Sequence, residues 1–242
     1  MVTFGRVAAI SDIHGNLPAL EAVLADVERA DVDAVVVAGD TISGPWAAEV
    51  FDLVKDLGAL VVRGNADREV IERSDRFGPL ARWSADRLGD ERLAFAASWP
   101  LTVELDVAGL GAVLVCHSTP ESEDPIYTSV TPEDELHALF ADVRADVVLC
   151  GHTHMQYDRA LAGGLRLVNP GSVGMPYEGR RGAFWALLGP DVELRESAYD
   201  VEAAAAAIEV MGAPVDARLL EYLLEPPDPV ATTEYFESLR GA

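Results

Sequence analysis

The chain is poor in the features that mark secreted or membrane-spanning proteins. It has two cysteines in 242 residues, Cys116 and Cys150, and they are not spaced as a C-x-x-C pair. We expect both to be small buried core residues and not a disulfide. No apolar run approaches the roughly 18 residues that a membrane span needs, and the amino terminus lacks a charged-then-apolar leader. A cytoplasmic protein that does not enter membranes is therefore expected.

Basic residues are also scarce. Eighteen arginines and lysines stand against 41 acidic residues, which gives a formal net charge of −23, and Lys55 is the only lysine. Such a surface repels the phosphate backbone of DNA and RNA over most of its area. A long nucleic-acid substrate is thus disfavoured, whereas a single nucleotide in a metal site is not. The simplest interpretation of the acidity itself is solubility, a high-salt habitat or genome composition.

The chain does contain short apolar runs that are each followed by metal-ligating residues. Runs of this length, rich in valine, isoleucine and leucine, are typical of buried strands. They occupy residues 7–10, 34–38, 60–62, 112–116 and 147–150. Because chemistry in open α/β sheets gathers at the carboxyl ends of the strands, the polar residues that follow these runs are candidates for one metal site. They are Asp12, His14, Asp40, Asn65, His117, His152 and His154.

The spacing and chemistry of these residues support a metal site. Asp12 and His14 are two residues apart, as are His152 and His154, so in an extended segment the members of each pair face the same way. Imidazole mixed with carboxylate and amide oxygen suits manganese, iron, zinc or nickel. A carboxylate such as Asp40 can bridge two cations, and two cations about 3.5–4 Å apart can hold a phosphoryl group and generate a hydroxide. The sequence therefore predicts a two-metal site.

The ordered set D-x-H, G-D, G-N, H and G-H-x-H resembles the signature of the calcineurin-like metallophosphoesterase superfamily. The resemblance extends from residue 6 to about residue 199. D-I-H-G-N at 12–16 and N-P-G-S-V-G at 169–174 are similar to its small bacterial and archaeal phosphodiesterase-type branch. The resemblance implies a hydrolase of phosphoester or phosphoanhydride bonds that favours a phosphodiester or nucleotide-type substrate. A phosphomonoesterase or protein phosphatase is the alternative, and a non-catalytic scaffold is disfavoured because all seven ligand positions are filled.

The resemblance also implies how the ligands share two divalent cations, with Mn²⁺ expected first and iron, zinc or nickel as alternatives. One ion would take Asp12, His14, Asp40 and His154, and the other Asp40, Asn65, His117 and His152. Asp40 would be the bridge, and a bridging hydroxide would be the nucleophile. The expected partner is a small phosphorylated or nucleotide-type molecule.

The residues after Asn65 bear on the catalytic acid. In similar phosphatases and nucleases a histidine commonly follows this asparagine and protonates the leaving oxygen, whereas here Ala66 and Asp67 follow. Alanine cannot donate a proton, and we expect Asp67 to be exposed and ionised at neutral pH. Asp67 and Arg68 would then orient ligands or hold phosphate, and good leaving groups would be favoured. The alternative is that another histidine of the site or a water supplies the proton.

Four further residues are candidates for substrate contact, and each has a simpler alternative. Asn16 also suits the N-cap of the helix that follows it. Tyr127 could stack on a base or an aryl group, or pack on its own neighbours. Arg180 and Arg181 could contact phosphate, since guanidinium groups match phosphate oxygens, or pair with surface carboxylates.

Two segments that join ligand-bearing strands are expected to form the walls of the substrate cleft. One is the charged helical stretch 68–98, which is interrupted by Gly-Pro and Gly-Asp breaks, and the other is the polar loop 118–130. Thr131 is expected to cap the helix that follows the loop, and His137 within that helix is expected to lie away from the site.

The expected fold is α/β, with two mixed sheets packed as a sandwich and flanked by helices. Strand, loop and helix alternate over the first 65 residues, and a hairpin ending at residue 116 makes the sheets mixed. The strand-like segments at 166–168, 183–188 and 192–199 are expected to form a second sheet packed on the first. We expect a metallophosphoesterase domain at 1–199 and a C-terminal helical appendage at 200–242.

Overall fold

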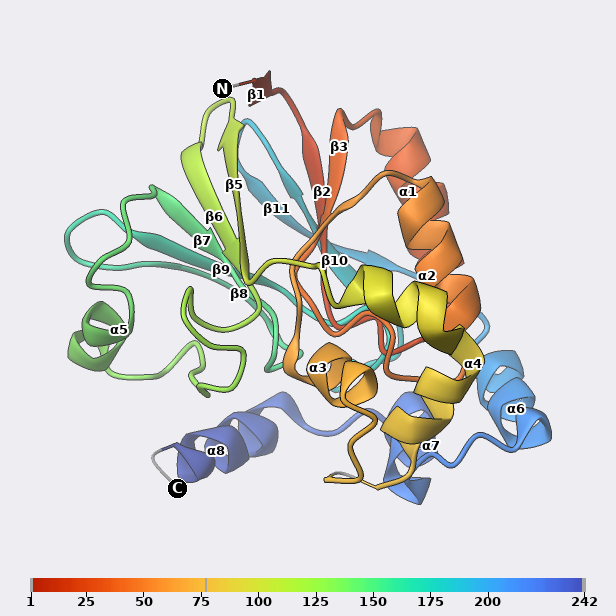
Figure 1. Ribbon diagram of the computed structural model, residues 1–242. Coiled ribbons are helices and arrows are strands. Elements are labelled where there is room, and N and C mark those ends of the chain that lie inside the picture. Colours follow the sequence, from red (N-terminus) through yellow and green to blue (C-terminus); the bar gives the residue numbers. More distant parts are fainter. Residues whose placement is uncertain (1, 77, 241–242) are drawn as a thin grey trace.

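Two mixed β-sheets pack face to face and carry helices on their outer faces, which confirms the expected fold. The structure is a computed structural model, and it describes residues 2–76 and 78–240 (Figure 1). The first sheet has five strands. In spatial order they are β11 (Val192–Ser197), β10 (Ala183–Leu188), β2 (Val7–Ile10), β3 (Ala34–Val37) and β4 (Leu60–Val61).

The second sheet has six strands. In spatial order they are β1 (Thr3–Phe4), β5 (Thr102–Val107), β6 (Gly111–Cys116), β7 (Val147–Leu149), β9 (Arg166–Pro170) and β8 (Gln156–Ala160). The predicted hairpin is the antiparallel pair β5 and β6. Each sheet contains both parallel and antiparallel neighbours, so both sheets are mixed.

The expected division of strands between the sheets is wrong. The last strands do not form a sheet of their own, because β9 pairs with β7 while β10 pairs with β2. The sequence of β10 explains its central place. Trp185 and Leu187 face the helices, whereas Ala186 and Leu188 face the other sheet, so every residue of the strand is buried. The ligand-bearing strands are consequently divided, with β2, β3 and β4 in one sheet and β6 and β7 in the other.

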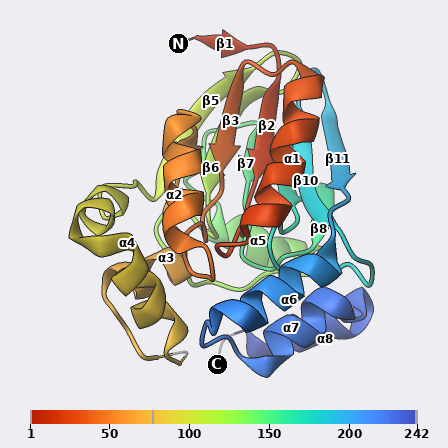
Figure 2. The same cartoon turned by 90° about the vertical axis from the view of Figure 1, so that its right-hand side faces the viewer.

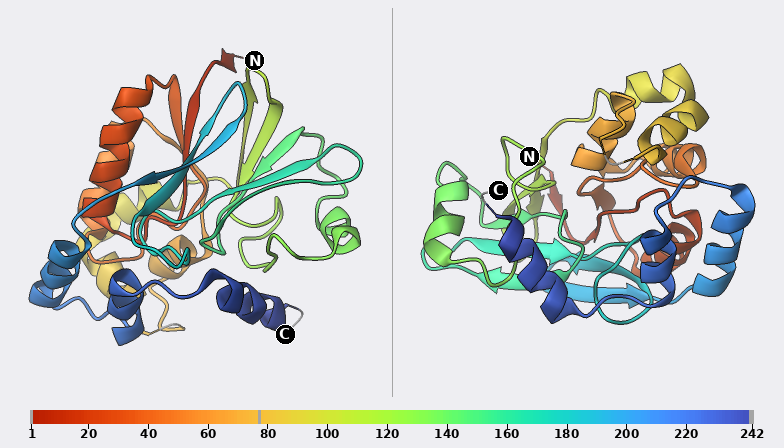
Figure 3. Two further views of the ribbon diagram at one scale, coloured as in Figure 1. Left: turned by 180° about the vertical axis from the view of Figure 1, so that it is seen from behind. Right: turned by 90° about the horizontal axis from the view of Figure 1, so that it is seen from below.

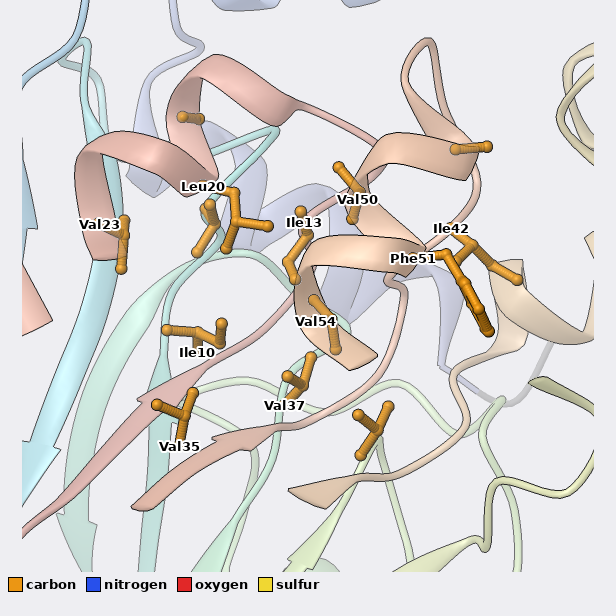
Figure 4. Close-up of a cluster of buried hydrophobic side chains, with 14 of the residues drawn as sticks. Ile10, Ile13, Leu20, Val23, Val35, Val37, Ile42, Val50, Phe51 and Val54 are labelled. Atoms are coloured by element: carbon orange, nitrogen blue, oxygen red, sulfur yellow. The ribbon is translucent and has the colours of Figure 1, made fainter. Parts of the chain in front are cut away.

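Alternate residues of β2 serve two hydrophobic layers. Val7 and Ala9 lie in the layer between the sheets, and Ala8 and Ile10 lie in the layer under the helices. Figure 4 shows this second layer, in which side chains of α1 and α2 meet those of the strands. Burial of this kind contributes about 1.5–3 kcal/mol for each large apolar side chain.

Four helices of the described chain lie on the outer side of the first sheet, and the first of them follows Asn16 as predicted. They are α1 (Leu17–Ala30), α2 (Ala47–Asp56), α3 (Asn65–Ile71) and α4 (Leu80–Ala96). Figure 2 shows α1 and α2 side by side over the strands, with α4 beyond them. The predicted breaks are confirmed, since α3 and α4 are separated around Gly78 and Gly89 interrupts α4 with a left-handed φ of 72°.

Helix α5 (Glu133–Leu139) lies on the outer face of the second sheet. The expected cap by Thr131 is wrong, because Pro132 occupies the N-cap position and no side chain caps this helix. The Thr131 hydroxyl instead accepts from the Thr128 N–H (2.8 Å) and donates to Glu237. His137 lies on the exposed side of α5 beside Glu133, outside the site, as predicted.

The last three helices lie at the end of the sandwich where the ligand-bearing strands finish. They are α6 (Val201–Met211), α7 (Ala217–Leu224) and α8 (Pro229–Leu239). In the view from below in Figure 3, α8 crosses this end of the molecule. Helices α6 and α7 share a hydrophobic cluster with Trp46 and Tyr199, and Glu237 of α8 accepts from the Thr128 hydroxyl (2.6 Å). A domain boundary at residue 199 stays a prediction.

The structure also bears on the expectations for the two cysteines and for membrane-spanning segments. Cys116 and Cys150 are unpaired and fully buried. Within the described ranges 2–76 and 78–240, the helices are all too short or too polar to cross a membrane.

Candidate metal centre

The structure brings the seven predicted ligands together at one end of the sandwich. They come from the loops that follow β2, β3, β6 and β7 and from the first residue of α3. The convergence depends on backbone strain. Seven non-glycine residues in the described chain have a left-handed φ, and five of them are predicted ligands. They are Asp12, His14, Asp40, His152 and His154.

This backbone corrects the argument from extended spacing. Left-handed φ values turn the chain at each ligand, so Asp12 and His14 approach each other across a turn and not along a strand. Conformations of this kind cost of order 1–3 kcal/mol each and persist where the surrounding structure imposes them, commonly at functional sites. A backbone strained at five candidate ligands therefore points to function independently of side-chain chemistry.

The first group of ligands is compact. One donor atom from each of Asp12, His14, Asp40 and His154 lies within 4.8 Å of the others. The Nε2 atom of His154 is 3.1 Å from Nε2 of His14 and 3.2 Å from a carboxylate oxygen of Asp12. The Nε2 atom of His14 lies 3.7 Å from Oδ2 of Asp40. This is the set that the family resemblance implies for one ion.

The second group adjoins the first through Asp40. The Nε2 atom of His117 is 3.5 Å from Oδ2 of Asp40 and 3.0 Å from Oδ1 of Asn65. The rings of His117 and His152 are 5.0 Å apart. The Nε2 atom of His152 is buried and has no hydrogen-bond partner among the described residues. A buried nitrogen of this kind is costly unless something binds it, so this orphaned atom fits a ligand position.

Backbone carbonyls fix how two imidazoles face the cluster. Nδ1 of His117 donates to the carbonyl of Ala38 (2.8 Å), and Nδ1 of His154 donates to the carbonyl of Met175 (2.7 Å). Each bond places the proton on Nδ1 and turns Nε2 toward the other ligands. Metal-binding histidines are held in this way as a rule, so the donor set fits divalent cations.

The glycines that precede two ligands are required by close approach. A Cβ on Gly39 would lie 2.5 Å from Nδ1 of His117, and one on Gly64 would lie 2.1 Å from Oδ1 of Asp40. The amide of Ala66 takes the space that Gly64 leaves and donates to Oδ1 of Asp40 (2.8 Å). The G-D and G-N pairs are thus packing requirements of the cluster.

Burial and mutual charge set the protonation of the cluster. Burial and the neighbouring His154 lower the pKa of His14 to about 4, and burial and His117 lower the pKa of His152 to about 4. Burial opposes ionisation of Asp40, but His117, His14 and His152 together outweigh it and lower the pKa of that carboxyl. His14 and His152 are therefore neutral at pH 7 and Asp40 is ionised, which are the forms that bind cations. Against the effect of burial, Asp40 raises the pKa of His117 to about 10, so this imidazole must lose a proton when a cation binds.

The expectation that Asp67 is exposed is wrong. Its side chain is fully buried and accepts from three backbone amides, those of Thr41 (2.8 Å), Ile42 (2.9 Å) and Gly64 (3.0 Å). Burial, with a smaller contribution from the charge of Asp40, raises the pKa of Asp67 to about 7. Asp67 thus ties the loop after Asp40 to the start of α3, and this position agrees with an orienting role.

Arg68 lies at the site but pairs with carboxylates of the 118–130 loop. Its guanidinium group donates to Glu123 (2.9 Å) and Asp124 (2.7 Å), and Arg63 also donates to Glu123 (2.7 Å). The hydrogen bond from Arg68 lowers the pKa of Asp124. The loop is therefore fastened beside the second group of ligands.

The four candidate substrate contacts occupy places that match their simpler alternatives. The Asn16 side chain caps α1 by accepting from Ala19 and donates to the Gly174 carbonyl. The Tyr127 ring is 3% exposed, and its hydroxyl donates to the Ser118 carbonyl. Two arginines pair with carboxylates. They are Arg180 with Glu196 and Arg181 with Glu202.

Sequence reasoning missed Tyr177. Its ring stacks on the imidazole of His154, with ring centres 4.8 Å apart and planes at 19°. The signal available was its position three residues after the N-P-G-S-V-G loop, whose Ser172 hydroxyl donates to the Asp12 carbonyl (2.7 Å). The loop is thus bonded to the first ligand segment, and Tyr177 follows it into the site.

Comparisons with known proteins agree with this geometry. The calcineurin-like phosphoesterase superfamily domain matches residues 6–188. An uncharacterized protein of Methanocaldococcus jannaschii is 30% identical over 222 residues, covering 82% of this chain and 89% of that protein. Two crystal structures are similar over almost the whole chain.

The first is a metallophosphoesterase from Sphaerobacter thermophilus, which is 27% identical with a TM-score of 0.73 and covers 92% of this chain and 99% of that one. The second is a hypothetical protein from Pyrococcus horikoshii, which is 21% identical with a TM-score of 0.78 and covers 94% of this chain and 100% of that one. The second likeness shows the fold alone.

Substitution of Asp40 should remove both metals. After reconstitution with Mn²⁺, we expect the Asp40→Ala variant to retain fewer than one ion per chain against two in the parent, because both groups of ligands lose the same carboxylate. Metal content by mass spectrometry checks this. His137→Ala is the control, since His137 lies outside the cluster. Two retained ions in Asp40→Ala would contradict the bridging position.

Substitution of Asp67 should destabilise the fold. The Asp67→Ala change leaves three buried amides without an acceptor, and we expect the free energy of unfolding to fall by about 3 kcal/mol. Urea unfolding of the metal-free protein measures this. Asp90→Ala, at a side chain that is 99% exposed, should change it by less than about 0.5 kcal/mol. Equal midpoints for the two variants would show that the Asp67 bonds stabilise nothing.

Proposed function

Because this chain belongs to the calcineurin-like phosphoesterase superfamily, we propose that it is a metal-dependent phosphoesterase that cleaves a phosphodiester or a nucleotide phosphoanhydride. The observation that carries the proposal is the complete donor set. Seven imidazole, carboxylate and amide side chains converge, and one buried imidazole nitrogen among them lacks a partner within the described part of the chain. A scaffold protein has no need to keep so strained and polar a cluster.

We assign the ligands to two cations as the family resemblance implies. Asp12, His14, Asp40 and His154 would hold one cation, and Asp40, Asn65, His117 and His152 the other. Two cations in these places supply Lewis acidity toward a phosphoryl oxygen and make a water more acidic. We propose Mn²⁺ for both, since the mixed nitrogen and oxygen donors suit it.

The start of α3 favours substrates with stable leaving groups. Ala66 follows Asn65 and offers only its backbone N–H, which is bonded to Asp40. The Asp67 side chain is turned inward to three amides and is fully buried, so it cannot reach a leaving oxygen. Without a positioned acid, an alkoxide leaves slowly, whereas a phosphate or a phenolate leaves readily. This favours anhydrides and activated diesters over phosphoserine.

The net charge favours small substrates over long nucleic acids. With a net charge of −23, the protein repels long nucleic acids, so we propose a small phosphorylated or nucleotide-type molecule as the substrate. The protein phosphatase alternative would need an acid for the serine oxygen, and no such side chain follows Asn65 in the sequence.

Rates should depend steeply on the leaving group. A series of methyl phosphodiesters is assayed with Mn²⁺. We expect kcat/KM to be lower by about 10²-fold or more for an alcohol leaving group than for p-nitrophenol, because no acid assists departure. Ala66→His is the matched variant, and it should flatten the dependence by supplying the missing imidazole. A parent enzyme whose rate is nearly independent of leaving-group pKa would contradict this proposal.

Removal of the Arg68 side chain should weaken substrate binding without loss of metal. Asp124 would lose its cation beside the site and repel an anionic substrate, so we expect KM to rise about fivefold in Arg68→Ala, which corresponds to about 1 kcal/mol. Steady-state kinetics with metal analysis checks this. Arg82→Ala, which frees Asp75 on the surface, is the control. Unchanged kinetic constants would place the 118–130 loop outside the site.

A further inference from the structure

We propose that the groove between α7 and the start of α4 binds the aromatic part of the substrate, a nucleobase or an aryl group. We call it the α4–α7 groove, and its lining includes Pro79, Leu80, Met175, Tyr177, Leu219 and Tyr222. The inference rests on the proposed phosphoesterase function and adds to it the group that lies beside the phosphate. It also gives the C-terminal helices a direct part in recognition.

The α4–α7 groove adjoins the metal centre. Two residues that line the groove contact the candidate metal ligand His154. The Met175 carbonyl accepts from Nδ1 of His154 (2.7 Å), and the Tyr177 ring stacks on the His154 imidazole (4.8 Å between ring centres). A molecule in the groove is thus separated from His154 by a single layer of side chain. Figure 1 shows α7 and the start of α4 next to each other below the strand ends.

The size of the groove suits a small ligand. Its volume is about 600 Å³, within the range of roughly 300–1,000 Å³ that is typical of small-molecule sites. Its walls come from segments far apart in the sequence, with Pro79 and Leu80 on one side and Leu219 and Tyr222 on the other. The first wall belongs to the 68–98 stretch that the sequence predicts as a cleft wall.

The lining is largely apolar, with one carboxylate at Asp216, and favours an uncharged ring over a phosphate. Tyr177 and Tyr222 meet edge to face, with centres 5.9 Å apart and planes at 87°, and the leucine and proline side chains add apolar surface. No arginine or lysine is among the described residues that line the groove, so it is unsuited to the phosphate itself. Aromatic side chains of this kind stack on any nucleobase. The phosphate would lie at the metals and the ring in the groove.

Kinetics on two substrates with the same leaving group tests this directly. Thymidine 5′-(p-nitrophenyl phosphate) and methyl p-nitrophenyl phosphate both release p-nitrophenolate, but only the first carries a base. With the full-length chain and Mn²⁺, we expect Tyr222→Ala to raise KM about tenfold for the thymidine ester and to leave the methyl ester unchanged. Tyr222→Phe keeps the ring and should behave as the parent.

Two further variants guard the interpretation. Tyr235→Ala removes a tyrosine that is 60% exposed on the neighbouring helix α8 and lies outside the groove lining, so it should affect neither substrate. Leu80→Gln changes the opposite wall and should raise KM for the thymidine ester alone. It keeps the test decisive if Tyr222→Ala does not fold, which circular dichroism would show.

A binding measurement separates this inference from the proposed function. Calorimetry with adenosine 5′-monophosphate and with ribose 5-phosphate needs no turnover, and we expect the first to bind about tenfold more tightly, with the preference lost in Tyr222→Ala. Hydrolysis of both esters without any preference for the base would overturn the groove and leave the phosphoesterase standing. Preference for the base without hydrolysis would overturn the phosphoesterase and support the groove. Absence of both would overturn both.

Discussion

The structure depends on one constraint: two carboxylates and four imidazoles are held within a few ångströms of one another in the interior. Burial disfavours every charged form in this group. Attraction between the carboxylates and the imidazoles offsets part of that cost. His117 shows the balance, since burial opposes its charge but Asp40 and Asp12 together raise its pKa to about 10. A cluster of this kind is unfavourable for folding by itself, so the surrounding fold must impose it.

The two hydrophobic layers supply the stabilisation that the cluster lacks. Side chains of β2 alternate between the layer under the helices and the layer between the sheets, so the short strand is held from both faces and its end is fixed. Backbone hydrogen bonds between the loops that follow the strands then hold these loops in place. The His14 N–H donates to the Asp40 carbonyl (2.9 Å), and the Gly151 N–H donates to the His117 carbonyl (2.9 Å). Left-handed ligand residues persist because these bonds join loop to loop.

The sequence was sufficient to predict which candidate ligands gather at one end of the sandwich, but not their environment. Sites in α/β folds gather at the carboxyl ends of strands, and the apolar runs before Asp12, Asp40 and His152 are short enough to recognise as strands. Strand order was not predictable, because the pairing of β10 with β2 depends on contacts between residues far apart in the chain. Burial of Asp67 also escaped prediction, since its three amide partners become neighbours only when the loops after β3 and β4 meet. Local sequence describes what a residue can bind, whereas tertiary packing decides what surrounds it.

The division of ligands between two sheets has a consequence for how the chain folds. The first sheet supplies the ligands up to Asn65 and the second supplies those from His117 onward, so His14 and His154 meet across 140 residues of chain. Contacts so distant in sequence carry a high entropic cost of loop closure and form after local structure. The cluster should therefore assemble only when the sheets have docked. Cations bound there would stabilise contacts that form late in folding, and would therefore slow unfolding more than they speed folding.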